Sequence, residues 1–434
     1  MSANQSTSRI VAVQGTAQLT SAIAALRAAD QAAGSDPANH LVIHDLCCPD
    51  DQAQEFADCI GRLAQLGAVW QSIHYVSAEA LGRLSTGTLA DGWSAAATGL
   101  RECIGVGTTD ELFLGQNLLF INQLLYRAYP DAVRACYGDG IGLNFSNDYY
   151  RVPAAPRERW GVNQPSMSIR SVGSRLKRNI LHRIRRWVGL PQGPLQPATD
   201  ACRAQPVPFD RHYLLLANLF DEQRDDFIQL DAADFHNLFA AYGAEIEPAA
   251  SQGCSPLVDA LPRASSVVVL LTSNFSETGR MTLDGEIACC MESVLQVGGG
   301  PGSLLVIKPH PRDARKKIDR LTTEARRHFA EVVSLDDRWT FYLPFESVFV
   351  RFFPPGSAIR AVTQVVCTSS AALSLEHLYG QQCSMGFGAP AVRQRFATAW
   401  QSLRLRHEAD LVAAIRLIRE RAVSNRPAPR NLQW

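Results

Sequence analysis

The strongest constraint on the fold is a series of short aliphatic runs that alternate with helical segments. Three of these runs are SSVVVLL from Ser265, SLLVI from Ser303 and the stretch Val362–Cys367. Runs of this length, rich in Val, Ile and Leu, are typical of strands that are buried on both faces. Helical segments such as Asp284–Gln296 lie between them, and the pattern therefore predicts a parallel sheet covered by helices.

The amino-terminal half alternates in the same way. The strand-like runs Ile10–Val13 and Leu41–Ile43 flank the Ala-rich helical stretch Leu19–Ala33, and a second helical pattern covers Asp50–Gly67. A chain of 434 residues also exceeds what one hydrophobic core usually supports. We therefore expect an α/β protein with two Rossmann-like, doubly wound domains facing a central cleft. The predicted boundaries are 1–248 for the first domain, 249–415 for the second and 416–434 for a carboxyl-terminal tail.

Other parts of the first domain have weaker patterns. A helical segment covers Gly115–Tyr129, and the short segment Arg134–Tyr137 leads into a glycine-rich turn. A Pro-rich, basic excursion follows at about 163–208. Tyr213–Leu216 then resembles a strand that rejoins the first domain, and helical sequence extends to about Glu247.

The composition narrows the class of function. Lys plus Arg and Asp plus Glu both number 42, so no net charge attracts nucleic acid. The 11 cysteines have no zinc-site spacing and are interpreted as small apolar residues in a reducing compartment. No apolar run of 18 residues occurs, and the amino terminus lacks a secretory pattern. We expect a cytoplasmic protein, with peripheral attachment to the inner face of the cytoplasmic membrane as an option.

That option comes from the basic sequence SRLKRNILHRIRRWVGL. Leu176, Ile180 and Ile184 share one helical face, while most of the Arg and Lys side chains lie elsewhere. Such a helix can contact an anionic membrane through residues 175–188, or it can bind a polyanionic acceptor. The alternative is a helix that packs on the protein and exposes a solvated basic rim.

A histidine flanked by two prolines is the most informative candidate site residue. In LLVIKPHPRD, a buried strand ends at Lys308, and His310 follows between Pro309 and Pro311. The two prolines fix the backbone around the imidazole. Lys308 and the nearby Arg312 add positive charge, so the segment favours phosphate recognition over a purely structural role.

Three consecutive hydroxyl residues form the second candidate site. In VVCTSSAAL, Thr368, Ser369 and Ser370 lie between a buried strand and a helix. One of them can simply cap the helix. A helix amino terminus with free N–H groups and hydroxyls also binds phosphate or carboxylate.

The third candidate is a single carboxylate between glycines. Asp139 lies in CYGDGIG, after a predicted strand of the first domain. It can stabilise its own turn, or it can act as a general base. Glycosyl transfer needs a base near the acceptor hydroxyl and anion-stabilising groups near the leaving phosphate, and the three motifs would place these on opposite domains.

Taken in order, YGDGIG, IKPHPRD and CTSSA resemble the bacterial polysialyltransferase family and related bacterial sialyltransferases. The resemblance covers roughly Glu111 to Gly388. It implies a GT-B fold, a CMP-sialic acid-type donor held mainly by the second domain, and an inverting mechanism. It also implies that Asp139 is the base, that His310 contacts the donor phosphate, and that Ser369 and Ser370 hold the phosphate or the donor carboxylate.

The sequence departs from the family at Gly138, which stands where the family has its first acidic residue. Glu346, in LPFES, resembles the family's P-x-E segment and is a candidate for binding ribose hydroxyls; an ordinary surface Glu is the alternative. Further candidates for donor binding are Thr272 and Ser273, after the first strand of the second domain. The departure at Gly138 weakens the inference of polysialic acid synthesis in particular.

Other enzyme classes lack their motifs. GVGTTD misses the third glycine of a dinucleotide fingerprint, and neither a GxxxxGK[ST] loop nor a GxSxG elbow occurs. We expect transfer of a sialic acid-type sugar, another nonulosonic acid or Kdo, from a CMP donor to a capsule, lipopolysaccharide or other surface glycan. The expected partners are thus a CMP-sugar and a glycan, with no cofactor or metal. The alternative is a catalytically silent sugar-nucleotide-binding or membrane-scaffold protein.

Overall fold

The structure is a computed structural model that describes residues 7–33, 37–44, 46, 48, 52–116, 119–138, 207–217, 219, 225–245, 255–337 and 340–424. Asp139 and the basic residues 175–188 lie outside these ranges. Within them, the first sheet has seven strands in the order β3-β2-β1-β4-β5-β6-β7, and the second has five in the order β10-β9-β8-β11-β12. All of these neighbouring strands pair in parallel.

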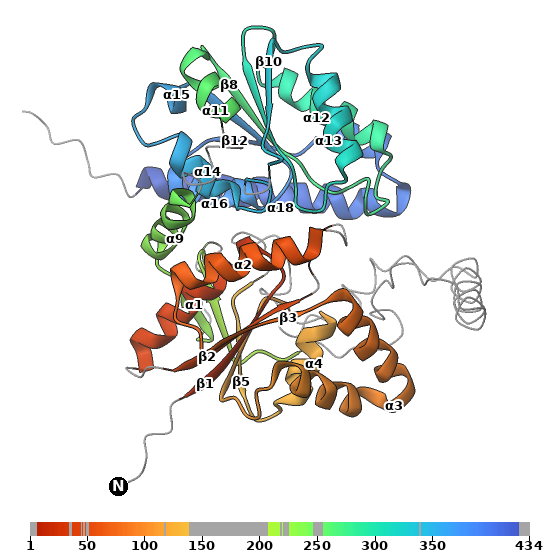
Figure 1. Cartoon of the computed structure of the whole chain (residues 1–434). Helices are drawn as coiled ribbons and strands as arrows, with labels where there is room; N and C mark the ends of the chain where they lie inside the picture. The colour runs from red at the N-terminus through yellow and green to blue at the C-terminus, as the bar shows by residue number, and fades with distance from the viewer. Residues whose placement is uncertain are drawn as a thin grey trace, which may run out of the picture.

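The first domain places helices on both faces of its sheet (Figure 1). Val11 and Val13 pack with α1 and α2, while Ile10 and Ala12 pack with α3 and α4 on the other face. This alternation follows from the two-residue period of a strand. The elements are β1 (Ser8–Val13), α1 (Thr16–Ala33), β2 (Ala38–His44), α2 (Ala53–Gly67), β3 (Ser72–Val76), α3 (Ala78–Ile104), β4 (Glu111–Leu114), α4 (Phe120–Ala128), β5 (Val133–Cys136), β6 (Arg211–Leu214), β7 (Phe227–Gln229) and α9 (Ala232–Ala244).

The second domain repeats this layered arrangement. Val268 and Leu270 of its central strand face α12 and α13, while Val267 and Val269 face the side of α14 and α16. The elements are α11 (Ser255–Ala260), the 3-10 turn η3 (Leu261–Arg263), β8 (Val267–Leu271), α12 (Leu283–Gln296), β9 (Leu304–Lys308), α13 (Arg315–Ala325), β10 (Glu331–Ser334), α14 (Phe345–Phe352), α15 (Ala358–Ala361), β11 (Thr363–Cys367), α16 (Ala371–Tyr379), β12 (Cys383–Met385), α17 (Ala389–Arg395) and α18 (Thr398–Ser424).

These two sheets confirm the predicted pair of doubly wound, Rossmann-like domains. Several elements differ from the sequence prediction. Strand β4 (Glu111–Leu114) is not among the predicted strands. The helix predicted from Gly115 begins only at Phe120, and Phe227–Gln229 is a strand within a stretch predicted to be helical. Strands of three or four residues are too short to show a period. At the other end, residues 416–424, assigned to the tail, continue helix α18.

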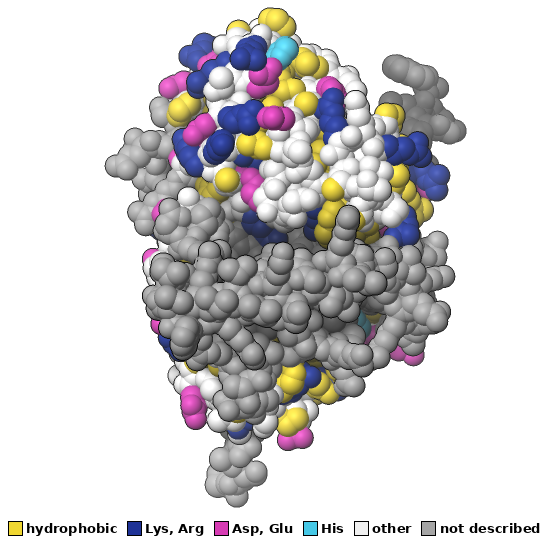
Figure 2. Space-filling view, turned by 90° about the vertical axis from the view of Figure 1, so that its right-hand side faces the viewer, with side chains coloured by type: hydrophobic (Ala, Val, Ile, Leu, Met, Phe, Trp, Pro, Cys, Tyr) yellow, Lys and Arg dark blue, Asp and Glu magenta, His cyan; other side chains and the backbone are white. Residues whose placement is uncertain are grey.

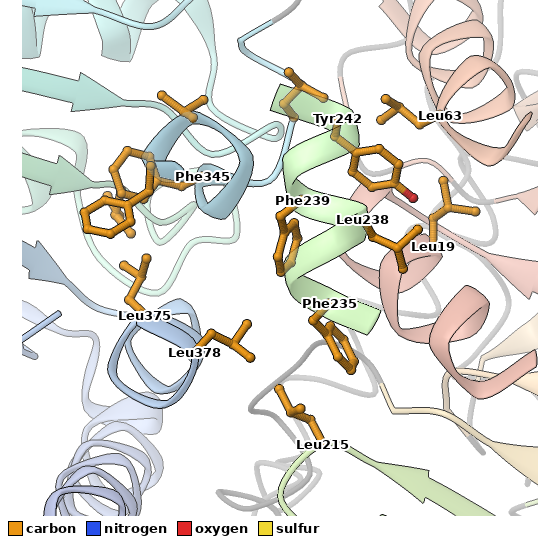
Figure 3. Close-up of a cluster of buried hydrophobic side chains, with 14 of the residues drawn as sticks. Leu19, Leu63, Leu215, Phe235, Leu238, Phe239, Tyr242, Phe345, Leu375 and Leu378 are labelled. Carbon is orange, nitrogen blue, oxygen red and sulfur yellow. The ribbon is translucent and has the colours of Figure 1, made fainter. Parts of the chain in front are cut away.

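Helix α9 joins the two domains through opposite faces (Figure 3). Leu238 and Tyr242 point toward Leu19 and Leu63 of the first domain, while Phe239 lies on the side of α14 and α16. Buried residues of both domains therefore belong to one continuous hydrophobic cluster.

The surface agrees with the balanced composition. Figure 2 shows Lys and Arg side chains interspersed with Asp and Glu over the second domain. Among the described helices, none combines the length and the hydrophobicity needed to cross a bilayer.

Candidate active site

The predicted site residues of the second domain meet at the carboxyl edge of its sheet. The strand order reverses between β8 and β11, and this is the point where open α/β sheets bind ligands. Thr272 and Ser273 follow β8, and Thr368 follows β11. The hydroxyls of Ser273 and Thr368 lie 2.6 Å apart and connect the two loops.

His310 is held in one orientation by the loop around it. Its backbone N–H donates to Thr272 Oγ1 at 2.8 Å and to Asp313 Oδ2 at 3.0 Å. Its ring atom Nδ1 accepts the backbone N–H of Arg312 at 3.1 Å. Burial, with the charges of Arg312, Lys308 and Lys317, lowers the pKa of His310 to about 3. The ring is therefore neutral at physiological pH, with its proton on Nε2, which can donate to a ligand because no described residue accepts from it.

A buried ion-pair network, absent from the sequence prediction, supports this loop. Lys317 Nζ lies 2.6 Å from Glu286 Oε1 and 2.9 Å from Asp313 Oδ1. It also donates to the carbonyl oxygen of Ser273. Asp313 and Glu286 are 2% and 0% exposed, so this single lysine compensates two buried carboxylates and fixes the loops after β8 and β9.

Lys308 connects the site to the first domain. Its buried ammonium donates to the carbonyl oxygens of Pro309 at 3.0 Å and Phe341 at 2.8 Å, and burial lowers its pKa to about 8. The next residue, Tyr342, stacks on Phe56, and its carbonyl oxygen accepts the hydroxyl of Thr16 at 2.7 Å. Lys308 thus positions a segment that contacts the end of the first sheet. Pro311 is half-buried beside His310.

The hydroxyl residues after β11 do not cap helix α16. Ser370 occupies the N-cap position but makes no capping hydrogen bond through its side chain. Thr368 bonds Ser273, and the hydroxyl of Ser369 lies 3.4 Å from Cys367 Sγ. Ser369 and Ser370 are half-buried at the helix amino terminus. The arrangement leaves an amino terminus suited to an anion.

Glu346 is not an ordinary surface residue. It lies in the first turn of α14, is 6% exposed, and accepts the hydroxyl hydrogen of Ser374. Burial raises its pKa above the usual value for Glu. The structure places it behind α16, beside the hydroxyl turn, because Ser374 lies in the first half of that helix.

In the first domain, β5 is followed by Tyr137 and Gly138, and Gly138 is the last described residue before Asp139. Gly138 has φ of 86°, a conformation that L side chains rarely adopt. An acidic residue at position 138 would therefore be strained, which gives a physical reason for the departure noted in the sequence.

His44, which ends β2 at this same edge, is 1% exposed, and neither ring nitrogen has a partner in the described residues.

Comparison with known proteins gives one family match, over the middle and carboxyl-terminal part of the chain. Residues 210–380 match the family model described as Alpha-2,8-polysialyltransferase (POLYST). The matched range contains the His310 loop, Glu346 and the hydroxyl turn, and it supports glycosyltransferase activity. No curated protein sequence matches the chain.

Solved structures with a similar arrangement include three sugar-nucleotide or glycosyl-transfer proteins. A sialyltransferase from Photobacterium damsela is 10% identical, with 88% of this chain and 81% of that chain covered and a TM-score of 0.30. The UDP-GlcNAc 2-epimerase from Neisseria meningitidis, bound to UDP-GlcNAc, is 12% identical, with coverage of 96% and 100% and a TM-score of 0.43. The glycotransferase of kitacinnamycin is 12% identical, with coverage of 98% and 99% and a TM-score of 0.33.

Two of the three ordered motifs, IKPHPRD and CTSSA, lie inside the family match, whereas YGDGIG lies outside it. The match begins just before β6, the next-to-last strand of the first sheet in chain order, and ends just after α16. The resemblance inferred from the motifs is confirmed, and over residues 210–380 the chain is similar to the alpha-2,8-polysialyltransferase family.

Proposed function

We propose that this protein is an inverting glycosyltransferase that moves a nonulosonic acid or Kdo from a CMP-sugar to a hydroxyl of a surface glycan. The observation that supports it most is the position of the His310 loop and the hydroxyl turn at one sheet edge, inside the segment that matches the polysialyltransferase family. Both features are suited to the phosphate of a nucleotide.

His310 and the amino terminus of α16 stabilise the departing CMP. The neutral imidazole donates from Nε2, because Nδ1 already accepts the N–H of Arg312. The helix amino terminus and the hydroxyls of Ser369 and Ser370 supply further donors. These groups favour the charge that builds up on the phosphate as its bond to the sugar breaks.

Asp139 acts as the base in this proposal. It takes the proton from the acceptor hydroxyl, whose oxygen attacks the anomeric carbon while the bond to the CMP oxygen breaks. The electron pair leaves with CMP, and the configuration at the anomeric carbon inverts. The leaving phosphate is stabilised by the second domain, so the chemistry requires no metal. Glu346 is proposed to bind the ribose hydroxyls. Lys308, Pro311, Thr272 and Ser273 are proposed to belong to the rest of the donor site.

A pair of variants at His310 tests the phosphate assignment. The amide nitrogen of Gln can replace Nε2–H, whereas that of the shorter Asn cannot reach the same place. We expect His310→Asn to lower turnover by about 10²- to 10³-fold, the usual effect of removing one such donor. His310→Gln should retain much more activity.

Calorimetry with CMP and steady-state kinetics with CMP-sugars measure both effects. An exposed residue of the same domain, changed as Arg393→Gln, provides the control and should behave as the unmodified protein. If both His310 variants bind CMP and turn over normally, the phosphate assignment is wrong.

A further inference from the structure

A second group of basic side chains, two arginines and a histidine, lies near the candidate site and has no role in the mechanism above. Arg280 lies in the loop after β8, while Arg404 and His407 lie on α18. Arg404 is 6% exposed, and its Nη2 atom has no hydrogen-bond partner in the described part of the chain. The Nε atom of Arg280 is buried without a partner there as well. Buried donors of this kind are costly unless an acceptor completes them.

Aromatic rings hold both guanidiniums in place. The guanidinium carbon of Arg404 lies 4.8 Å from the ring centre of Phe275, and that of Arg280 lies 5.0 Å from the ring centre of Trp400. Phe275 belongs to the same loop as Arg280, and Trp400 precedes Arg404 by one helical turn. The loop and the helix therefore fix each other's arginine through two reciprocal cation–π contacts.

The cluster has an excess of positive charge. Arg404 Nε donates to Glu408 Oε1 at 2.8 Å, but that carboxylate also accepts the backbone N–H groups of Phe387 and Gly388. No described carboxylate pairs with Arg280. Burial and the charges of Arg404 and Arg312 lower the pKa of Arg280, and burial with Arg404 and Arg280 lowers the pKa of His407 to about 4.

Backbone contacts place the cluster at the edge that holds the phosphate-binding features. Arg280 lies on the loop that begins with Thr272 and Ser273, and its carbonyl oxygen accepts the N–H of Ala397 at 2.8 Å, just before α18. The charge of Arg312, in the His310 loop, acts on Arg280. Arg280 is only half-buried, so a ligand at this edge can reach it.

We propose that Arg280 and Arg404 bind the carboxylate that the donor sugar carries on its anomeric carbon. This inference rests on the proposed function, because every sugar named there is a 2-keto acid with a carboxylate one bond from the carbon that is attacked. Planar guanidiniums match carboxylates in geometry and charge. The phosphate has separate donors at His310 and α16, so the arginines serve the second anion of the donor.

Calorimetry with two ligands tests the assignment on the full chain. The ligands are CMP and the non-reactive 3-fluoro analogue of CMP-N-acetylneuraminic acid, which differ by the sugar and its carboxylate. We expect Arg280→Gln to weaken binding of the analogue about 10- to 100-fold and to change CMP binding less than threefold. Arg280→Lys keeps the charge but loses the planar guanidinium. Its affinity for the analogue should lie between that of the unmodified protein and that of Arg280→Gln. Arg393→Gln, on neighbouring α17, is the matched control.

Three results would overturn the inference. Equal weakening of CMP and of the analogue would make Arg280 part of the phosphate site. Unchanged affinity for both ligands, with a raised KM for an anionic acceptor, would assign the arginines to the acceptor. Failure of the unmodified protein to bind either ligand would contradict the proposed function itself, and the inference with it.

Discussion

At the scale of single residues, each sheet has an imidazole near its carboxyl edge, half-buried at His310 and fully buried at His44. His310 has hydrogen bonds that fix its ring, but His44 is 1% exposed and has no partner for either ring nitrogen in the described residues. Burial lowers the pKa of His44 to about 3. Its ordinary value in an unfolded chain is about 6.5. The unfolded state therefore binds one more proton between these values, and stability falls as pH drops below about 6.5.

We predict that His44→Leu removes this contribution. At pH 5 the buried imidazole should lower the free energy of unfolding of the unmodified protein by about 2 kcal/mol relative to pH 7. Urea unfolding at several pH values measures how the free energy of unfolding changes with pH in the unmodified protein and in His44→Leu. His328, whose side chain is 40% exposed, supplies the control as His328→Gln. An unchanged slope in His44→Leu would show that this histidine titrates normally.

At the scale of elements, the sequence predicts those strands whose residues are mostly apolar. Strands β8 and β9 are buried along their length, β11 is buried except at Gln364, and all three are recognisable from composition alone. The ion pair that supports the His310 loop is not recognisable in the same way. Lys317 in α13 and Glu286 in α12 are 31 residues apart in the sequence, and only folding brings them together. Only the spacing of Asp313 and Lys317, four residues apart, gives a local signal.

We predict that Lys317→Met destabilises the protein by about 3–5 kcal/mol, because it leaves Asp313 and Glu286 buried without their cation. Arg320→Met, on the same helix, removes an exposed pair with Asp284 and should cost less than about 1 kcal/mol. Urea denaturation compares the two variants. Similar losses in both would mean that the buried network contributes no more than a surface pair.

At the scale of the whole molecule, helix α9 connects the two domains through one hydrophobic cluster. The sequence predicts two domains but not this shared core, because a helix gives no sign of which two surfaces it will bury. Phe239 belongs to the shared cluster, while Phe329 lies in a cluster of the second domain alone.

We predict that the protein unfolds in a single calorimetric transition. Phe239→Ala and Phe329→Ala should each lower the stability by about 3–5 kcal/mol and move that transition as a unit. Two resolved transitions, with Phe329→Ala shifting only one, would show that the domains unfold independently in spite of the shared cluster.

The central claim, transfer of a sugar from a CMP donor, is tested by mass spectrometry of acceptor glycans incubated with CMP-N-acetylneuraminic acid or CMP-Kdo. We predict that one donor adds a sugar mass to an acceptor and releases an equal amount of CMP. Asp139→Asn should bind CMP normally and transfer about 10²- to 10⁴-fold more slowly, as expected for the loss of a general base. CMP binding without a sugar adduct, for every donor and acceptor tried, would contradict the claim and favour a silent sugar-nucleotide-binding protein.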